Sequence, residues 1–343
     1  MRYRPVINGL ENSLRSLAVV AATGVGNMFK IFNSAGFRRS SKSTTFACMN
    51  KIFLLSLVLL ASVPAAGQGL DRADGRTVCP EAVVCPSGCD ARSAMRCHPW
   101  CGKRVAFLGD SMTDPRNDSG DIRTKYWGYL QEWLGITPYV YGISGRQWND
   151  IPRQAEKLKA EHADSVDAIT VFIGTNDFNA GVPVGRWYDE SEDSVLAAVH
   201  GPKKYYLRKR RVPSMDGSTF KGRINKGIQS LKTLFPDKQI VLLTPIHRAR
   251  AEFSDTNLQP DESWQNACGE YFDAYVQAVK EAANVWGIPV IDLNALIGVN
   301  PLVEAQQQYF HDAATDLLHP NYKGHRRLAA TLMAQLAALP VDF

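Results

Sequence analysis

Short apolar runs alternate with amphipathic stretches along most of the second two-thirds of the chain. The apolar runs are rich in Val and Ile and are bounded by Gly, Pro or Asp, and they lie at 105–108, 139–141, 168–173, 240–243 and 290–293. Continuous short runs of this kind are typical of parallel strands that are buried on both faces. Helical spacing of apolar positions falls between and after them, at 126–134, 151–161, 222–234, 263–286 and 323–339. Strands that alternate with helices predict a three-layer α/β/α sandwich with about five parallel strands.

One segment interrupts this alternation. Residues 181–219 form a long insert that contains Trp187, then an acidic patch, then a basic run at 203–211. Insertions of this length in a compact domain are functional or disordered in most cases. Two interpretations stay open: a solvated surface excursion, or a lid or wall beside the active site that attracts an anionic substrate.

The chain carries a pattern typical of a secretory signal at 49–67. A basic start at Met49 to Lys51 is followed by an apolar run of about a dozen residues and a region of small residues. Residues 1–48 show no sustained period, so we interpret them as an upstream extension. A signal anchor is the alternative, but the apolar run is shorter than the roughly twenty residues that a bilayer span needs. We expect export to a periplasmic or extracellular location and no stable membrane anchor.

Cysteines cluster just before the first predicted strand, within a cysteine-rich segment at 68–102. Apart from Cys48, which precedes the signal, the cysteines are Cys79, Cys85, Cys89, Cys97, Cys101 and Cys268. In an oxidising compartment such a cluster favours disulfides, whereas zinc is disfavoured because the spacings contain no CxxC pair and only His98 lies nearby. Five clustered cysteines cannot all pair among themselves, so Cys268 is a candidate partner, and the connectivity stays open.

Composition narrows the class of protein. A chain of 343 residues with 45% hydrophobic and 21% charged residues is globular material, which excludes disorder of the whole chain. The formal charge of +5 is modest, and basic residues of the first fifty positions contribute to it. Nucleic acid is therefore not an expected partner.

Candidate chemistry begins with a serine. Gly109-Asp110-Ser111-Met112 directly follows the first strand, so Ser111 lies at the carboxyl end of the sheet, where α/β proteins bind ligands. Alone, such a turn is more typical of a solvated strand exit. Catalysis requires a base to take the hydroxyl proton and donors to hold the oxyanion.

Other strand ends offer both kinds of group. Asn176 follows the third strand in Gly174-Thr175-Asn176-Asp177, and Gly142 and Gly145 lie in the turn after the second strand. Near the C-terminus, Asp316 precedes His319 by three residues. That spacing puts two side chains on one face of a helical turn, so Asp316 is placed to orient the imidazole. The rival histidines lack both an acid three residues before and a proline after them: His247, His311 and His325.

These four segments, in this order, resemble the SGNH (GDSL-type) hydrolases over residues 103–339. The resemblance rests on Leu108-Gly109-Asp110-Ser111, Gly142-Ile143-Ser144-Gly145, Gly174-Thr175-Asn176-Asp177 and Asp316-Leu317-Leu318-His319-Pro320. It implies a flavodoxin-like sheet within a hydrolase domain at 103–343. It also implies Ser111 as the nucleophile, His319 as the base and Asp316 as the orienting acid. The implied oxyanion donors are Ser111, Gly145 and Asn176, with Gly142 close enough to compete with Gly145.

The resemblance implies an esterase that works through an acyl-enzyme, without a metal or other cofactor. Family members cleave lipid esters, aryl esters and O-acetyl groups on sugars. Aromatic, Arg and amide side chains near the blocks favour a short-acyl ester on a carbohydrate, with a lipid ester as the alternative. The candidate substrate contacts are Arg146, Trp148, Asn179 and Trp187, with Tyr126, Trp127, Gln147 and Tyr188 nearby. Packing of these aromatic residues is the competing interpretation, and a non-catalytic glycan-binding module is the alternative of another class.

Overall fold

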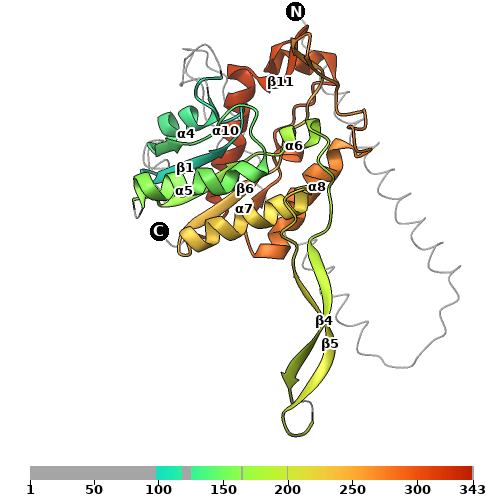
Figure 1. Ribbon diagram of the computed structural model, residues 1–343. Coiled ribbons are helices and arrows are strands. Elements are labelled where there is room, and N and C mark those ends of the chain that lie inside the picture. Colours follow the sequence, from blue (N-terminus) through green and yellow to red (C-terminus); the bar gives the residue numbers. More distant parts are fainter. Residues whose placement is uncertain (1–97, 118–124, 164, 199, 342–343) are drawn as a thin grey trace, which may run out of the picture. The chain divides into compact units, whose positions relative to one another are not determined.

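A five-stranded parallel sheet forms the centre of the fold (Figure 1). The computed structural model describes residues 98–117, 125–163, 165–198 and 200–341. The sheet has the order β2-β1-β3-β6-β9, and its strands are Thr137–Val140, Arg104–Gly109, Ala168–Phe172, Gln239–Leu243 and Val290–Ile291. This order is that of the flavodoxin-like sheets, and it confirms the predicted fold class. The predicted signal segment at 49–67, the extension at 1–48 and the cysteine-rich segment up to residue 97 lie outside the described residues.

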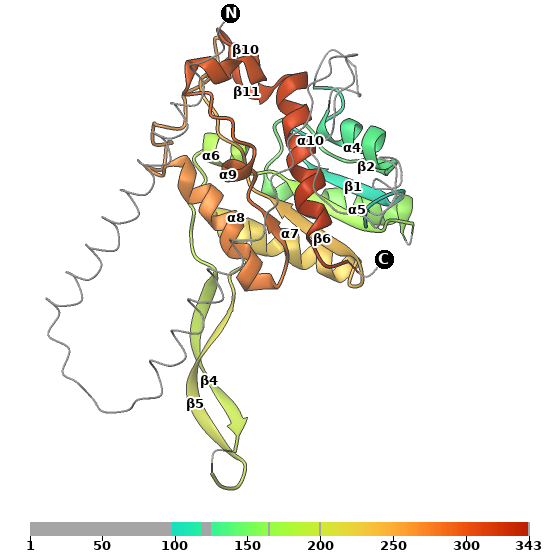
Figure 2. The ribbon, with the colours of Figure 1, turned by 180° about the vertical axis from the view of Figure 1, so that it is seen from behind.

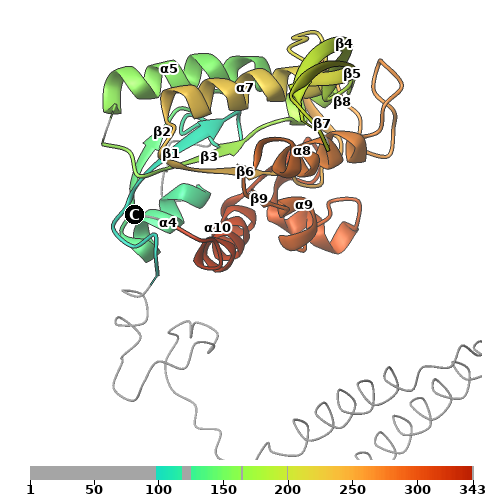
Figure 3. The ribbon, with the colours of Figure 1, turned by 90° about the horizontal axis from the view of Figure 1, so that it is seen from below.

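Helices cover both faces of the sheet, because both faces of each central strand are apolar. In β1, Val105 and Phe107 pack into one hydrophobic cluster, while Ala106 and Leu108 pack into the other. The first cluster includes α4 (Tyr126–Leu134) and α10 (Tyr322–Ala337). The second cluster includes α5 (Ile151–His162), α7 (Phe220–Leu234) and α8 (Phe272–Trp286). Figure 3 shows the sheet edge-on between the α5–α7 layer and the α4–α10 layer, so the sandwich has three layers.

The predicted helix at 263–286 begins later than its sequence pattern suggests. The side-chain oxygen of Asn266 accepts the backbone N–H groups of Cys268 and Glu270 at 3.2 and 3.0 Å. Side-chain bonds of this kind compete with helical hydrogen bonds and favour turns. The helix α8 therefore starts at Phe272. Two short elements complete the layer near β9: α9 (Leu293–Leu296) and a 3₁₀ helix at Glu304–Tyr309.

A smaller sheet lies at one end of the sandwich, near α6 (Thr175–Asn179), as Figure 2 shows. Its order is β10-β11-β7-β8, and its strands are Phe310–Asp312, Asp316–Pro320, Ala251–Ser254 and Asn257–Gln259. Both pairs that involve β11 are antiparallel. This sheet carries the Asp316–His319 segment.

The insert at 181–219 contains a long antiparallel hairpin, formed by β4 (Tyr188–Ala197) and β5 (Lys204–Pro213). Figures 1 and 2 show that it extends from the domain in the direction opposite to β11. The hairpin is therefore a surface projection and does not cover the Asp316–His319 segment, so the lid interpretation is wrong. Among the described residues, the helices are too short or too polar to span a bilayer.

Candidate active site

The turn after β1 holds Ser111 at the carboxyl end of the sheet. The carbonyl of Asp110 accepts the N–H groups of Thr113 and Asp114 at 3.0 and 2.9 Å, which closes the turn around the serine. The Gln154 side chain exchanges two hydrogen bonds of 2.9 Å with the backbone of Gly109, where β1 ends. A Cβ at Gly109 would overlap the Phe172 carbonyl, so this strand end requires glycine. The turn is thus held on both sides.

A continuous hydrogen-bonded chain joins Ser111, His319 and Asp316. The His319 Nε2 lies 2.8 Å from the Ser111 Oγ, and its Nδ1 lies 2.9 Å from the Asp316 Oδ2. The three side chains are largely buried; Ser111 is 5% exposed. Burial by itself raises the pKa of Asp316, but hydrogen bonds and charge from His319 outweigh it, so the pKa lies below its usual value. Asp316 is thereby kept as a carboxylate that faces the imidazole.

The local structure of this pair differs from the prediction. Asp316 and His319 lie in the strand β11, not on a helical turn. The Asp316 Oδ1 accepts the backbone N–H groups of Leu318 and His319 at 3.1 and 3.0 Å. This side-chain turn folds the chain back and brings the His319 ring to the other carboxylate oxygen. A spacing of three therefore joins the two side chains through a different local geometry.

The two glycines of the segment Gly142-Ile143-Ser144-Gly145 have different environments. Gly142 is buried, and a Cβ there would lie 2.6 Å from the Thr113 Cβ. Gly145 is exposed, has a φ of 77°, and a Cβ there would meet nothing within 4 Å. Gly142 is required for close packing, whereas Gly145 presents its backbone at the surface of the turn. Within the described part of the chain, the N–H groups of Ser111 and Gly145 have no hydrogen-bond acceptor.

Asn176 lies on α6 and is tied to the same turn. The Asn176 Nδ2 donates to the backbone carbonyl of Arg146 at 3.0 Å. The backbone carbonyl of Asn176 accepts from the Gln147 Nε2 at 3.1 Å. A primary amide has two N–H bonds, so one remains for a ligand. The structure therefore brings Asn176 next to the turn that contains Gly145 and Arg146.

A buried ion pair between Asp177 and Arg223 supports the turn at 146–148, and no sequence pattern indicated it. Asp177 is fully buried, and its Oδ1 accepts from Arg223 of α7 at 2.9 Å. Its Oδ2 accepts the Trp148 N–H at 3.0 Å, while the same Arg223 nitrogen donates to the Gln147 Oε1 at 2.8 Å. Burial raises the pKa of Asp177 to about 6 despite these bonds. Arg223 is thus a positioning residue for residues 146–148.

Asp114 connects the turn that holds Ser111 to the turn at 142–145. Its Oδ2 accepts the backbone N–H and the hydroxyl of Ser144 at 2.8 and 3.0 Å. Arg116 donates two side-chain hydrogen bonds of 2.9 Å to the same carboxylate. Burial opposes ionisation, but these bonds outweigh it and lower the pKa of Asp114 to about 2. The two loops are therefore held in register by a permanent carboxylate.

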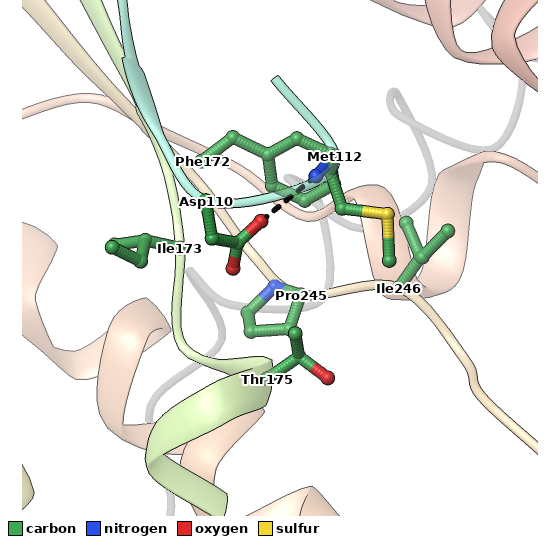
Figure 4. A pocket seen from close by; sticks show the side chains of 7 residues that line it. All are labelled: Asp110, Met112, Phe172, Ile173, Thr175, Pro245 and Ile246. Atoms are coloured by element: carbon green, nitrogen blue, oxygen red, sulfur yellow. Dashed lines mark hydrogen bonds between the residues drawn. The ribbon is translucent and has the colours of Figure 1, made fainter. Parts of the chain in front are cut away.

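Asp110 lines a small interior cavity beside the turn that holds Ser111. Figure 4 shows its carboxylate beside Met112, whose N–H it accepts at 3.0 Å, and above Pro245 and Thr175. The cavity measures about 10 Å³, which is the room that one water-sized sphere takes. Burial raises the pKa of Asp110 to about 7, and the nearby Asp177 charge adds to this. Asp110 supports the serine turn from the inside.

The predicted substrate contacts divide into two pairs. Arg146 and Asn179 are exposed, close to Gly145 and Asn176 in the sequence. Trp148 is fully buried, and its ring fills the notch that Gly227 leaves on α7, so the prediction that it contacts substrate is wrong. Trp187 lies at the base of the hairpin and donates to Glu281 of α8 at 2.7 Å, which makes it an anchor for the insert.

Two further aromatic candidates also belong to the core. Tyr126 and Trp127 are buried. The Tyr126 hydroxyl lies 2.9 Å from the Thr113 hydroxyl, and the Trp127 Nε1 donates to the Thr113 backbone carbonyl at 3.1 Å. One aromatic residue near the site was missed by the sequence reasoning. Phe253 of β7 is 44% exposed, and its ring centroid lies 5.4 Å from that of His319. Because β7 pairs with β11 only in the folded sheet, no local pattern indicated this contact.

Among the described residues, the three rival histidines and the cysteines make no hydrogen bond to Ser111 or His319. The His247 Nδ1 bonds to Glu262 at 2.6 Å, and His325 is buried beside Tyr126. His311 is exposed, with its Nδ1 3.8 Å from the Asp316 Oδ2. Within the described residues, Cys101 and Cys268 are both free. The other cysteines of the cluster lie outside those residues, so disulfides among them stay a prediction.

Comparison with known proteins gives the family. The model of the GDSL-like lipase/acylhydrolase family matches residues 107–327, whereas a search of curated proteins gave no match. A protein from Lactobacillus plantarum is 24% identical, with a TM-score of 0.53 over 70% of this chain and 99% of that one.

Two further structures show lower similarity. They are a member of the lipolytic G-D-S-L family from Veillonella parvula and a catalytic mutant of an acetylxylan esterase from Geobacillus stearothermophilus. The first is 15% identical, with a TM-score of 0.43 over 69% of this chain and 99% of that one. The second is 20% identical, with a TM-score of 0.41 over 71% of this chain and 97% of that one. The family match covers more than half of the chain, including all four blocks. The chain therefore belongs to the GDSL-like lipase/acylhydrolase family and is a carboxylic ester hydrolase.

Proposed function

We propose that this protein hydrolyses esters through an acyl-enzyme on Ser111. The observation that carries the proposal is the chain of two short contacts from the Ser111 Oγ through the His319 imidazole to the Asp316 carboxylate, 2.8 and 2.9 Å long. In such a chain the imidazole accepts the serine proton while the carboxylate fixes the ring tautomer and stabilises the imidazolium. Ser111 is the nucleophile, His319 the general base and Asp316 the orienting acid.

The reaction proceeds in two steps. The Ser111 Oγ attacks the ester carbonyl as His319 takes its proton, and the tetrahedral oxyanion is held by the N–H groups of Ser111 and Gly145 and by the Asn176 amide. His319 then protonates the departing alkoxide, which leaves an acyl-serine. Water, deprotonated by His319, attacks this acyl group and releases the carboxylic acid and the free serine. Pre-bonding of Asn176 to Arg146 limits the reorganisation that the oxyanion site needs.

The substrate we propose is a short-acyl ester, such as an O-acetyl group, on a carbohydrate. Arg146 and Asn179 are exposed polar side chains near the oxyanion donors, and Phe253 offers an exposed ring beside His319. Sugars bind to such combinations of a ring face with polar donors and acceptors. These features support a polar alcohol such as a sugar hydroxyl.

The test compares nitrophenyl acetate, acetylated xylan and a long-chain nitrophenyl ester as substrates of the full chain. We expect rapid turnover of the acetate, acetate release from xylan, and at least about a thousandfold loss of kcat in Ser111→Ala. Preference for the long-chain ester would replace the carbohydrate assignment with a lipid ester. No turnover of any ester, together with binding of the glycan, would indicate a non-catalytic module.

A further inference from the structure

The hairpin of residues 188–213, here called the arm, is a two-stranded sheet whose strands pair only with each other. Ten residues of each strand, from Tyr188↔Pro213 to Ala197↔Lys204, stay in register. At about 3.3 Å per residue the arm is roughly 30 Å long. Isolated two-stranded hairpins are marginally stable in water. We therefore expect an arm of this length to have a role other than connecting the segments on either side of it.

The outer half of the arm exposes large apolar side chains. Register pairs Leu196 with Tyr205 and Ser194 with Leu207, which places three of these apolar side chains on one face. Leu196 is 51% exposed, Leu207 68% and Tyr205 72%. Val195 adds a fourth exposed apolar group on the opposite face, where it is 43% exposed. Soluble surfaces expose such side chains singly, so this group marks an interaction site.

Charge on the arm is separated along its length. The acidic residues lie in the inner half of β4, at Asp189, Glu190, Glu192 and Asp193. From Ser194 to Val212 the sequence contains no Asp or Glu and has six cations: Lys203, Lys204, Arg208, Lys209, Arg210 and Arg211. The inner cations lie opposite the acids, as in the Arg210–Asp193 ion pair of 2.8 Å. Lys203 and Lys204 have no acid opposite them, so the outer end is apolar and cationic together.

This combination decides between candidate partners. Parallel pairing of like edges of two arms would place acids against acids in β4 and cations against cations in β5, which disfavours a second copy in that arrangement. A polyanionic glycan would satisfy the lysines but would leave the exposed leucines in contact with hydroxyl groups. A bilayer with anionic headgroups satisfies both, since aliphatic and Tyr side chains enter the headgroup region while Lys side chains pair with phosphates.

We propose that the outer half of the arm, at residues 194–198 and 200–207, binds reversibly to the surface of an anionic phospholipid bilayer. The arm extends away from β11, so contact at its end leaves the Ser111 side of the domain free. The arm then acts as a peripheral tether and requires no membrane-spanning helix. The inference is independent of the ester chemistry at Ser111.

The first test is co-sedimentation of the full chain with vesicles, using phosphatidylcholine alone or phosphatidylcholine mixed with phosphatidylglycerol. We expect binding to the mixed vesicles that weakens with added salt, and little binding to phosphatidylcholine alone. A shortened arm keeps the fold: Asp193 and Arg208 face each other in register, so Asn-Gly can join them in place of residues 194–207. This variant should lose vesicle binding while its nitrophenyl acetate turnover stays unchanged.

Point variants separate the two contributions. Lys203→Gln with Lys204→Gln should weaken binding roughly thirtyfold, at about 1 kcal/mol for each charge. Leu196→Ser with Leu207→Ser should weaken it about tenfold or more, through lost apolar burial. The matched control is Lys157→Gln with Lys280→Gln, which removes two cations in surface ion pairs on α5 and α8. This control should bind vesicles like the unmodified chain.

Three outcomes would overturn the inference. The first is no binding to anionic vesicles at low salt. The second is binding that the shortened arm retains. The third is arm-dependent binding to an anionic polysaccharide such as polygalacturonate when vesicles are not bound, which would assign the arm to a glycan. Loss of esterase activity in Ser111→Ala leaves vesicle binding intact, so failure of the tether and failure of the proposed reaction are distinguishable.

Discussion

Asp316 holds His319 with both of its carboxylate oxygens, one on the imidazole Nδ1 and the other on the backbone N–H of the same residue. The acid therefore fixes the position of the histidine along the strand and the orientation of its ring together. Because β11 is anchored between β10 and β7, this pair is set against Ser111 by the small sheet and not by the central one.

Replacing Asp316 with Asn should lower kcat by about a thousandfold to ten-thousandfold. The Asn carbonyl can still accept the Leu318 and His319 backbone N–H groups, so folding is retained. Its NH₂ group then faces Nδ1 and favours the imidazole tautomer that cannot take the Ser111 proton. Nitrophenyl acetate kinetics check this, with His311→Gln as the control, since His311 is an exposed second imidazole near the same carboxylate. Equal losses in both variants would contradict the assignment.

Asn176→Ala tests the oxyanion site. Removal of one donor costs on the order of a hundredfold to a thousandfold in kcat, because the developing negative charge loses a preorganised partner. We expect KM to change little, since the donor acts in the transition state. The matched control is Asn149→Ala, which removes an exposed amide on the 3₁₀ helix Trp148–Asp150 and should keep the parental kcat. Unchanged kcat in Asn176→Ala would remove this residue from the site.

We expect substitutions of Arg223 and Asp177 to have coupled effects on the free energy of unfolding. Arg223→Met leaves a buried carboxylate unpaired and should destabilise the fold by about 3 kcal/mol. Adding Asp177→Asn removes that charge, so the double variant should recover part of the lost stability. Urea unfolding of both single variants and the double variant gives the coupling free energy. Strictly additive losses would show that the two side chains do not act as a pair.

The same pair should affect catalysis through position. Residues 146–148 are held by Arg223 through Gln147 and by Asp177 through the Trp148 N–H. Arg223→Met should therefore lower kcat by about tenfold, a fraction of the effect of losing Asn176 itself. Arg223→Lys restores the charge without the planar fork and should recover stability better than kcat. If kcat is lost only in proportion to the unfolded fraction, the positioning role is contradicted.

Asp110 predicts a pH dependence of stability. Its pKa is about 7 in the folded chain, against about 3.9 for an exposed Asp, so the folded state binds more protons between these values. Stability therefore falls as pH rises through this range. Asp110→Asn keeps an acceptor for the Met112 N–H and cannot ionise, so its stability relative to the parent should increase with pH. Urea unfolding at several pH values between about 4 and about 8 measures this difference. A difference that stays constant with pH would contradict the raised pKa.

The sequence predicted the central sheet well, because parallel strands buried on both faces leave continuous apolar runs such as 168–172. It also predicted the pairing of Asp316 with His319, but with a helical turn in place of a strand. A spacing of three fits both a helical turn and the side-chain turn that Asp316 forms. The proposed signal segment at 49–67 lies outside the described residues and stays a prediction.

Contacts between distant segments could not be predicted. Trp148 carries the same sequence signal as an exposed sugar-binding ring, and only the notch at Gly227 shows that it belongs to the core. Arg223 of α7 contacts Asp177 of α6 only in the folded chain, and no period in the sequence connects the two. Phe253 reaches His319 through the pairing of β7 with β11. Each of these depends on tertiary packing.

The most direct test of the proposed reaction is to trap the acyl-enzyme. The full chain is mixed with nitrophenyl acetate, quenched in acid during turnover, digested, and mapped by mass spectrometry. We expect an acetyl group on Ser111, and neither this adduct nor significant turnover in Ser111→Ala. An acetyl group that accumulates on another residue during turnover, or a Ser111→Ala variant that hydrolyses the ester at the parental rate, would contradict it.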